Sequence, residues 1–179
     1  MKDTYIPSSI IDRNQRMFTN NEYYFFSLKL KIQGNIDAHR LETAVAKVAE
    51  AIPILRYYYS GTLEKSGWKP LPKNPGWVTR SSAEPVALYT LLKSLPTEHS
   101  PMHIVLDKKP DSDTLVISMD HTVTDAHGLL EIAGMISSTY AALGWNPDFS
   151  LLPIPQSEDR SLKPLIQSYS HEVCESLCR

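Results

Sequence analysis

The stretch from Leu115 to Gly134, LVISMDHTVTDAHGLLEIAG, constrains the fold more than any other part of the chain. It opens with an apolar, β-rich run that is typical of a buried strand. A short turn follows, and a helix is expected from about Asp125 to Leu143, with Gly144 at its end. The apolar residues of this helix recur at helical spacing: Leu129, Ile132, Ala133, Ile136 and Tyr140. The sequence therefore predicts a strand, a turn and a helix in direct succession.

A second strand and helix are expected nearer the N-terminus, after an irregular arm from Met1 to Asn21. The segment Tyr23 to Ile32 ends in strict alternation of apolar residues with lysines, which predicts a strand with one buried face. After a turn at Gly34-Asn35, Asp37 is the expected N-cap of a helix that Pro53 stops. The apolar residues of that helix are Leu41, Ala44, Val45, Val48, Ala49 and Ile52.

The middle of the chain is rich in strand-forming residues. The run ILRYYYSGTL and the Gly/Pro/Lys-rich stretch from Lys65 to Gly76 predict a hairpin and a surface loop. Pro85 to Leu95 is expected to form a short helix. Met102 to Leu106 and Thr114 to Met119 are expected to be strands joined by the turn KKPDSD. This order of elements predicts a single α+β domain over residues 1–179, a two-layer sandwich with helices on one face of a mixed sheet.

Composition narrows the function classes. The apolar fraction of 42% and the charged fraction of 21% are ordinary for a globular protein. A net charge of -2 without a cluster of Lys and Arg argues against nucleic acid as a partner. No apolar run is long enough to span a membrane, and the N-terminus lacks the apolar core of a signal peptide, so a cytoplasmic location is expected. Cys174 and Cys178 are expected to be reduced thiols, because the other ligands of a zinc site are missing.

His121 is the candidate catalytic residue. It follows a buried strand, which would hold it rigidly, and histidine titrates near neutrality, so it can serve as a general base. Asp125 opens the next helix, and Gly128 allows close packing there. A metal site formed with His127 is disfavoured, because helical register places His127 on a different face. His99 and His103 are interpreted as surface or packing residues.

The pattern His121-x-x-x-Asp125, with Gly128, resembles the active-site motif of the CoA-dependent acyltransferases that include condensation domains and alcohol acetyltransferases. Two positions depart from that motif: Asp120 replaces the first His of its doubled form, and Ala126 replaces the glycine after the aspartate. The segments Glu50 to Gly61 and Ile6 to Phe18 also resemble parts of the same superfamily. The resemblance covers its N-terminal half, which is similar to one chloramphenicol acetyltransferase subunit.

The resemblance implies transfer of an acyl group from a thioester to a hydroxyl or amine, with His121 as general base. Acyl-CoA or acyl-phosphopantetheine would be the co-substrate, with no covalently bound cofactor and no metal; the cofactor-binding residues are unassigned. Asp125 would be a structural anion that is turned away from the substrate, faces the protein interior and is paired with Arg56. The alternative for Arg56 is an arginine that faces solvent.

The superfamily's second half, with its share of the channel and of the oxyanion stabilisation, has no counterpart in this chain. Three interpretations stay open: a fragment, a chain that pairs with itself or with a second-half chain, and a non-catalytic binding or scaffold module. The second predicts an exposed apolar wall, for which Tyr57 to Tyr59 and Leu151 to Pro155 are candidates. It also predicts that the chain is not a stable isolated monomer.

Overall fold

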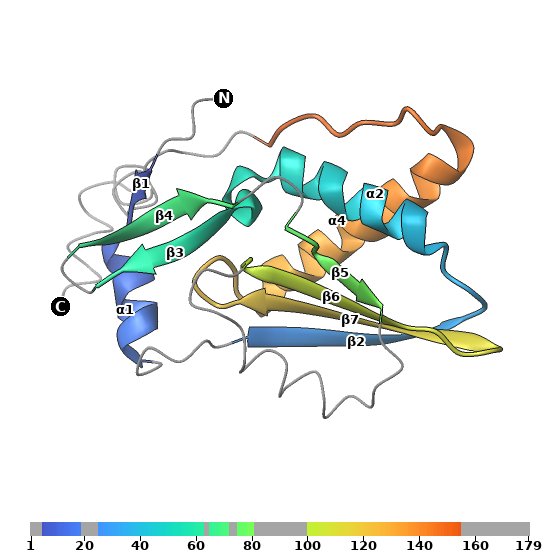
Figure 1. Ribbon diagram of the computed structural model, residues 1–179, viewed down its shortest axis with the longest axis horizontal. Coiled ribbons are helices and arrows are strands. Elements are labelled where there is room, and N and C mark those ends of the chain that lie inside the picture. The colour runs from blue at the N-terminus through green and yellow to red at the C-terminus, as the bar shows by residue number, and fades with distance from the viewer. Residues whose placement is uncertain (1–4, 19–24, 63–64, 72–74, 81–99, 155–179) are drawn as a thin grey trace, which may run out of the picture.

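The computed structural model describes residues 5–18, 25–62, 65–71, 75–80 and 100–154, and in this part of the chain it contains two sheets (Figure 1). The larger sheet has the strand order β2-β7-β6-β5. Its members are β2 (Phe25–Gln33), β7 (Ser112–Asp120), β6 (Met102–Asp107) and β5 (Val78–Arg80). β5 runs parallel to β6, and the other neighbouring pairs are antiparallel. The expected mixed sheet and its β6–β7 hairpin are therefore confirmed.

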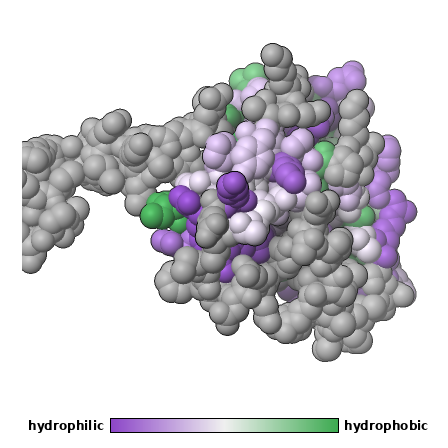
Figure 2. Space-filling view, turned by 60° about the vertical axis from the view of Figure 1, so that its left-hand side comes forward, coloured by the Kyte–Doolittle hydropathy of each residue, from purple (hydrophilic) through white to green (hydrophobic). Residues whose placement is uncertain are grey.

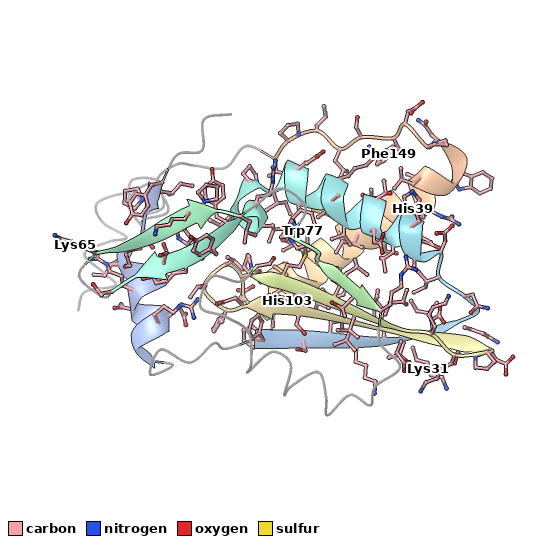
Figure 3. All side chains as sticks on the ribbon, in the orientation of Figure 1. Lys31, His39, Lys65, Trp77, His103 and Phe149 are labelled. Carbon is pink, nitrogen blue, oxygen red and sulfur yellow. The ribbon has the colours of Figure 1, made fainter. Side chains whose placement is uncertain are left out.

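Two long helices lie side by side over one face of this sheet, α2 (Ala38–Ala51) and α4 (Ala126–Trp145) (Figure 1). The core fills the space between them and the sheet. Leu41, Val45 and Val48 of α2 meet Leu129, Ile132 and Ile136 of α4 and Met102, Ile104, Leu106, Leu115, Ile117 and Met119 of the sheet. Trp77 lies between α2 and the sheet (Figure 3). These are the apolar positions that the periodicity predicts, because each set shares one face of its element.

β2 shows how the alternation positions the sheet. Leu28, Leu30 and Ile32 pack against the core, while Lys29 and Lys31 are exposed on the other face (Figure 3). β2 is also the neighbour of β7 along its whole length, with Phe26 opposite Met119 and Gln33 opposite Ser112. The register therefore brings the start of β2 beside the end of β7, where the candidate histidine follows.

α2 begins and ends where the sequence indicates. Gly34 turns the chain with a φ of 92°, a left-handed conformation that glycine adopts without a steric penalty. Asp37 is the N-cap, and its carboxylate accepts a hydrogen bond from the N–H of Arg40. After Ile52, Pro53 starts the short 3₁₀ helix η1 (Pro53–Arg56), since proline cannot continue the α-helical hydrogen bonds.

The smaller sheet contains the predicted hairpin. Its order is β1-β4-β3, with β3 (Tyr57–Gly61) and β4 (Ser66–Pro70) antiparallel and β1 (Ile6–Pro7) on the far edge of β4. Trp68 of β4 is 1% exposed, and the ring of Tyr59 meets it edge-on, with 5.3 Å between ring centroids. Tyr57 is buried in the main core. It therefore cannot belong to an exposed wall, and that part of the prediction is wrong.

The prediction of an irregular N-terminal arm is also wrong, because residues 10–18 of the arm form the helix α1 (Ile10–Phe18). Ser9 and Asp12 cap this helix reciprocally: the Asp12 carboxylate accepts from the Ser9 N–H, and Ser9 Oγ accepts from the Asp12 N–H. Among residues 10–16 of α1, whose burial is described, Asp12 and Arg16 are buried, whereas Ile10 and Ile11 are exposed. The segment is short and mostly polar, and its apolar residues stand only at its two ends, which favoured an irregular arm over a helix in the sequence.

Several other expectations have definite outcomes. The second long helix extends through Gly144 to Trp145, so Gly144 does not end it. Leu152 and Ile154 are exposed, as the expected wall requires, but they follow a half-buried Leu151. No helix in the described ranges is long and apolar enough to cross a membrane. The expected helix at Pro85 to Leu95, together with His99, Pro155, Cys174 and Cys178, lies outside the described residues.

Candidate active site

A tight turn follows β7 and carries the candidate histidine. The N–H of Val123 donates to the carbonyl of Asp120 at 3.0 Å, which closes a β-turn with His121 and Thr122 at its centre. The Asp120 carboxylate folds over the same turn: Oδ1 accepts from the N–H of Thr122 at 2.8 Å and from its hydroxyl at 2.7 Å. Aspartate favours the first position of such turns for this reason.

The hydrogen bond of His121 determines which ring nitrogen carries the proton. Nδ1 lies 3.0 Å from the carbonyl oxygen of Thr124. A carbonyl can only accept, so Nδ1 is the donor, and the neutral ring keeps Nε2 as its proton acceptor. The half-buried ring is also held edge-on against Phe26 of β2, with 4.5 Å between centroids. His121 therefore stands directly after a buried strand, in the tautomer that suits a base acting through Nε2.

Asp125 does not face the interior, in contrast to its expected orientation. It is exposed, and its carboxylate accepts a hydrogen bond of 2.8 Å from the N–H of Gly128, as the N-cap of α4. That bond lowers the pKa of Asp125 below its ordinary value. Gly128 packs closely against the preceding turn, because a Cβ there would lie 2.1 Å from Thr124 Oγ1. Asp125 and Gly128 thus shape the helix start beside His121.

The expected ion pair between Asp125 and Arg56 is also wrong. Arg56 is exposed at the end of η1, and among the described residues no ion pair joins it to Asp125. The local N–H of Gly128 already satisfies the aspartate, so no distant cation is required. The alternative of a solvent-facing Arg56 is the one that the structure shows.

A buried ion pair does exist beside His121, but it joins two other residues. Arg16 of α1 donates to Asp120 Oδ2 at 2.8 Å, and the two side chains are 7% and 3% exposed. The sequence reasoning missed Arg16 and Thr122. The available signals were the Ser9-x-x-Asp12 capping pattern, which marks a helix start, and the unusual Asp120 in place of a histidine.

The other histidines have contacts of their own. His127 lies 3.4 Å from Glu131 one helical turn away, and both are well exposed. His103 of β6 meets Phe25 of β2 edge-on, on the sheet face away from the helices. Within the part of the chain that the structure describes, no group of three or more His, Cys, Asp or Glu side chains could hold a metal ion.

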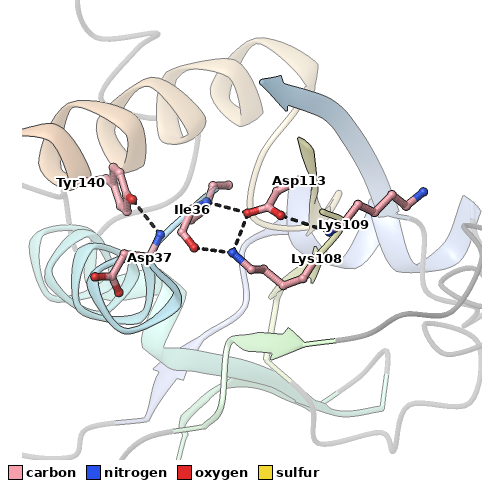
Figure 4. Close-up of polar contacts among 6 residues, drawn as sticks. All are labelled: Ile36, Asp37, Lys108, Lys109, Asp113 and Tyr140. Atoms are coloured by element: carbon pink, nitrogen blue, oxygen red, sulfur yellow. Dashed lines mark hydrogen bonds and ion pairs between the residues drawn. The ribbon is translucent and has the colours of Figure 1, made fainter. Parts of the chain in front are cut away.

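A second buried carboxylate, Asp113, lies at the start of β7, at the opposite end of the strand (Figure 4). It accepts from the N–H of Ile36 at 2.6 Å, from the Lys108 ammonium at 2.9 Å and from the N–H of Lys109 at 3.3 Å. Burial alone would raise the pKa of Asp113, but these three donors outweigh burial and hold it below the ordinary value.

The outer surface near α1 and the smaller sheet is mostly hydrophilic or neutral. In Figure 2, the apolar residues on this face form separate spots, and no continuous apolar patch appears among the residues drawn in colour. The most exposed large apolar side chains in the described part of the chain are Trp145, at 91%, and Leu152, at 87%. Trp145 is the last residue of α4 and Leu152 follows the helix, so neither is close to His121 in the sequence.

Comparisons with known proteins support the fold. No protein-family model matches the chain, and no curated protein sequence matches it. Solved structures do. Polyketide synthase associated protein 5 from Mycobacterium tuberculosis is 16% identical, with a TM-score of 0.72 over 93% of this chain and 40% of its own. The X-domain of teicoplanin biosynthesis, solved in a complex with OxyB, is 18% identical, with a TM-score of 0.70 over 86% of this chain and 36% of its own.

Condensation domains share the fold as well. The starter condensation domain of rhizomide synthetase is 17% identical, with a TM-score of 0.62 over 92% of this chain and 43% of its own. A variant of that domain was solved in complex with C8-CoA, and its TM-score is 0.64. The chain therefore has the fold of part of a condensation-type domain, and it spans about two fifths of the length of these structures.

Proposed function

We propose that this chain supplies the general base, His121, of an acyltransferase site that moves an acyl group from a CoA or carrier-protein thioester to a hydroxyl or amine. The observation that carries the proposal is the hydrogen bond from His121 Nδ1 to the Thr124 carbonyl. It keeps Nε2 unprotonated in the neutral ring, at the end of a rigid buried strand. The C8-CoA complex of a protein with this fold supports an acyl thioester as donor.

The proposed reaction needs one proton acceptor that later becomes a donor. His121 Nε2 takes the proton of the acceptor O–H or N–H as that atom attacks the thioester carbonyl carbon. The tetrahedral intermediate then collapses, the carbon–sulfur bond breaks, and the imidazolium returns its proton to the leaving thiolate. The products are the free thiol and an ester or amide. We assign the oxyanion-stabilising groups to a second half, on a separate chain, on a second copy or on a longer chain of which this sequence is a part.

The test uses octanoyl-CoA with simple alcohols and amines and measures release of free CoA thiol. His121→Ala should lower the rate about 10²- to 10⁴-fold, the usual contribution of a general base. His127→Ala is the matched control, since His127 is exposed six residues away and has no assigned role. Equal loss in both variants, or full activity in His121→Ala, would contradict the proposal.

A second candidate is a non-catalytic binding module. The complex of the teicoplanin X-domain with OxyB favours it, because that domain, which shares this fold, binds another protein. Such a module would release no thiol from octanoyl-CoA even in the presence of a second half, and the exposed Leu152 and Trp145 would be the first places to search for a protein contact. Light scattering adds one distinction: self-association of the chain favours a site shared between two copies over a site completed by another chain.

A further inference from the structure

We propose that Arg16, Asp120 and Thr122 form the positioning apparatus of His121, in place of the Asp125–Arg56 pair that the resemblance implies. This inference rests on the proposed role of His121 as a base. Asp125 is exposed and satisfied by its own helix, while Asp120 is buried and accepts hydrogen bonds from Arg16 on α1 and from Thr122 in the turn. The buried anion beside His121 is therefore Asp120, the residue before the histidine, and not Asp125, four residues after it.

The Asp120 carboxylate uses its two oxygens for two different tasks. Oδ1 accepts from the N–H and the hydroxyl of Thr122, which fixes the turn around His121. Oδ2 accepts from Arg16, which belongs to another layer of the fold. The backbone N–H of Asp120 is held as well, at 2.8 Å from the carbonyl of Pro101. The backbone and the carboxylate of the residue that precedes His121 are thus both held by hydrogen bonds.

Arg16 is itself held firmly. Its guanidinium lies over the ring of Tyr59 in the smaller sheet, 5.1 Å from the ring centroid, where a cation is attracted to the aromatic face. One turn earlier on α1, Asp12 accepts a hydrogen bond of 3.2 Å from the Trp68 indole. The helix is therefore fastened to the smaller sheet at two points. Through Arg16 and Asp120, the turn at the end of β7 is tied to that sheet.

The consequence for His121 follows from geometry. Its Nδ1–H reaches Thr124 only while the chain from Asp120 to Thr124 keeps its tight turn. If the Asp120 carboxylate loses its partners, the turn loosens and the Nδ1–H bond to Thr124 forms less often. The ring then samples the other tautomer, in which Nε2 carries the proton and cannot act as a base.

The test measures the tautomer of His121 by ¹⁵N NMR of histidine-labelled protein at a pH where the ring is neutral. Asp120→Asn should lower the ratio of the Nδ1–H to the Nε2–H tautomer about fivefold or more, as expected for losing roughly one hydrogen bond. Asp113→Asn is the matched control, because it removes the charge of the other buried carboxylate on the same strand. It should leave the ratio unchanged.

Thr122 provides a gentler pair of variants in case Asp120→Asn does not fold. Thr122→Val removes the hydroxyl and should lower the ratio of the two tautomers. Thr122→Ser keeps the hydroxyl and should leave the ratio as in the wild type. A merely structural role would lower stability in Asp120→Asn and Thr122→Val without changing the ratio, and that result overturns the inference. Failure of the proposed function looks different: the tautomer shift occurs as described, yet His121→Ala releases thiol from octanoyl-CoA as fast as the wild type.

Discussion

The two ends of β7 carry the same chemical group in two different settings. At the start of the strand, Asp113 is bound by the N–H groups of Ile36 and Lys109 and by Lys108, all from loops adjoining the same sheet. At its end, Asp120 is bound by Arg16 from α1, a helix fastened to the other sheet. Both carboxylates are buried, at 0% and 2% exposure.

The two carboxylates therefore serve different purposes. Asp113 holds loops at one end of the sheet, whereas Asp120 holds the turn that carries His121. Asp113 closes the loop that leads into α2, and the partner Lys108 stays 43% exposed, so water can still reach the cation. The Arg16–Asp120 pair is almost fully buried. A buried pair of this kind is a weak source of net stability, because desolvation offsets much of the attraction. Its value at this end is positional, and His121 is the residue that it positions.

The largest expected effect comes from breaking the buried pair. Arg16→Met should cost about 3–5 kcal/mol in the free energy of unfolding, because it leaves the Asp120 charge buried without its cation. The double variant Arg16→Met with Asp120→Leu should recover much of that loss, since both charges are gone. Urea denaturation measures both. If the single variant is as stable as the wild type, the pair is not buried as described.

The corresponding change at the other end should be smaller. Asp113→Ala leaves the buried N–H of Ile36 without its acceptor, while the N–H of Lys109 is only partly buried, so the expected loss is about 1–3 kcal/mol. Lys108 can turn to water, so no isolated buried cation remains. A loss larger than that of Arg16→Met, measured in the same urea series, would reverse the proposed ranking of the two ends.

The Asp113 end should also depend on pH. Its folded pKa is depressed, so its contribution is fully present above the unfolded pKa, about 3.9, and is lost as the pH falls through the folded value. The stability difference between wild type and Asp113→Asn should therefore shrink as the pH falls below about 4. Thermal unfolding of both proteins between neutral and acidic pH measures it. A difference that widens with acid would contradict the assignment.

The smallest effect is expected at the helix start beside His121. Gly128→Ala places a Cβ 2.1 Å from Thr124 Oγ1. Overpacking of this kind costs about 1–3 kcal/mol, and the better helix propensity of alanine offsets about 1 kcal/mol of it. Thr124→Ala removes the clashing oxygen, so Gly128→Ala should stabilise the protein in that background. Thermal unfolding of the four combinations shows whether the sign changes.

Local patterns predicted the elements that bury an apolar face. The alternation in β2 and the spacing in α2 and α4 each identify a surface that water disfavours, and these elements form the core. α1 gives a weaker signal, because the residues between its apolar ends are all polar and two of them, Asp12 and Arg16, are buried. Its capping residues, Ser9 and Asp12, were the available signal. The fold of the larger sheet was therefore predictable, and the helix that completes the site was not predicted.

The site was predictable in part for the same physical reason. A strand, a turn and a helix in succession place His121, and its tautomer follows from a carbonyl only three residues away. The ion pair could not be assigned, because Arg16 and Asp120 are 104 residues apart and no local rule pairs them. The resemblance favoured Asp125 and Arg56 instead, but an N-cap aspartate satisfied by Gly128 needs no distant arginine.

The tautomer of His121 in the wild-type chain is the most direct test of the account. Histidine-labelled protein is measured by ¹⁵N NMR at a pH high enough for its histidine rings to be neutral. The exposed His127 serves as the internal comparison. The account predicts that His121 carries its proton on Nδ1, bonded to the Thr124 carbonyl, while His127, whose Nε2 lies 3.4 Å from the Glu131 carboxylate, carries its proton on Nε2. A proton on Nε2 of His121 would contradict both its role as a base and the positioning by Asp120.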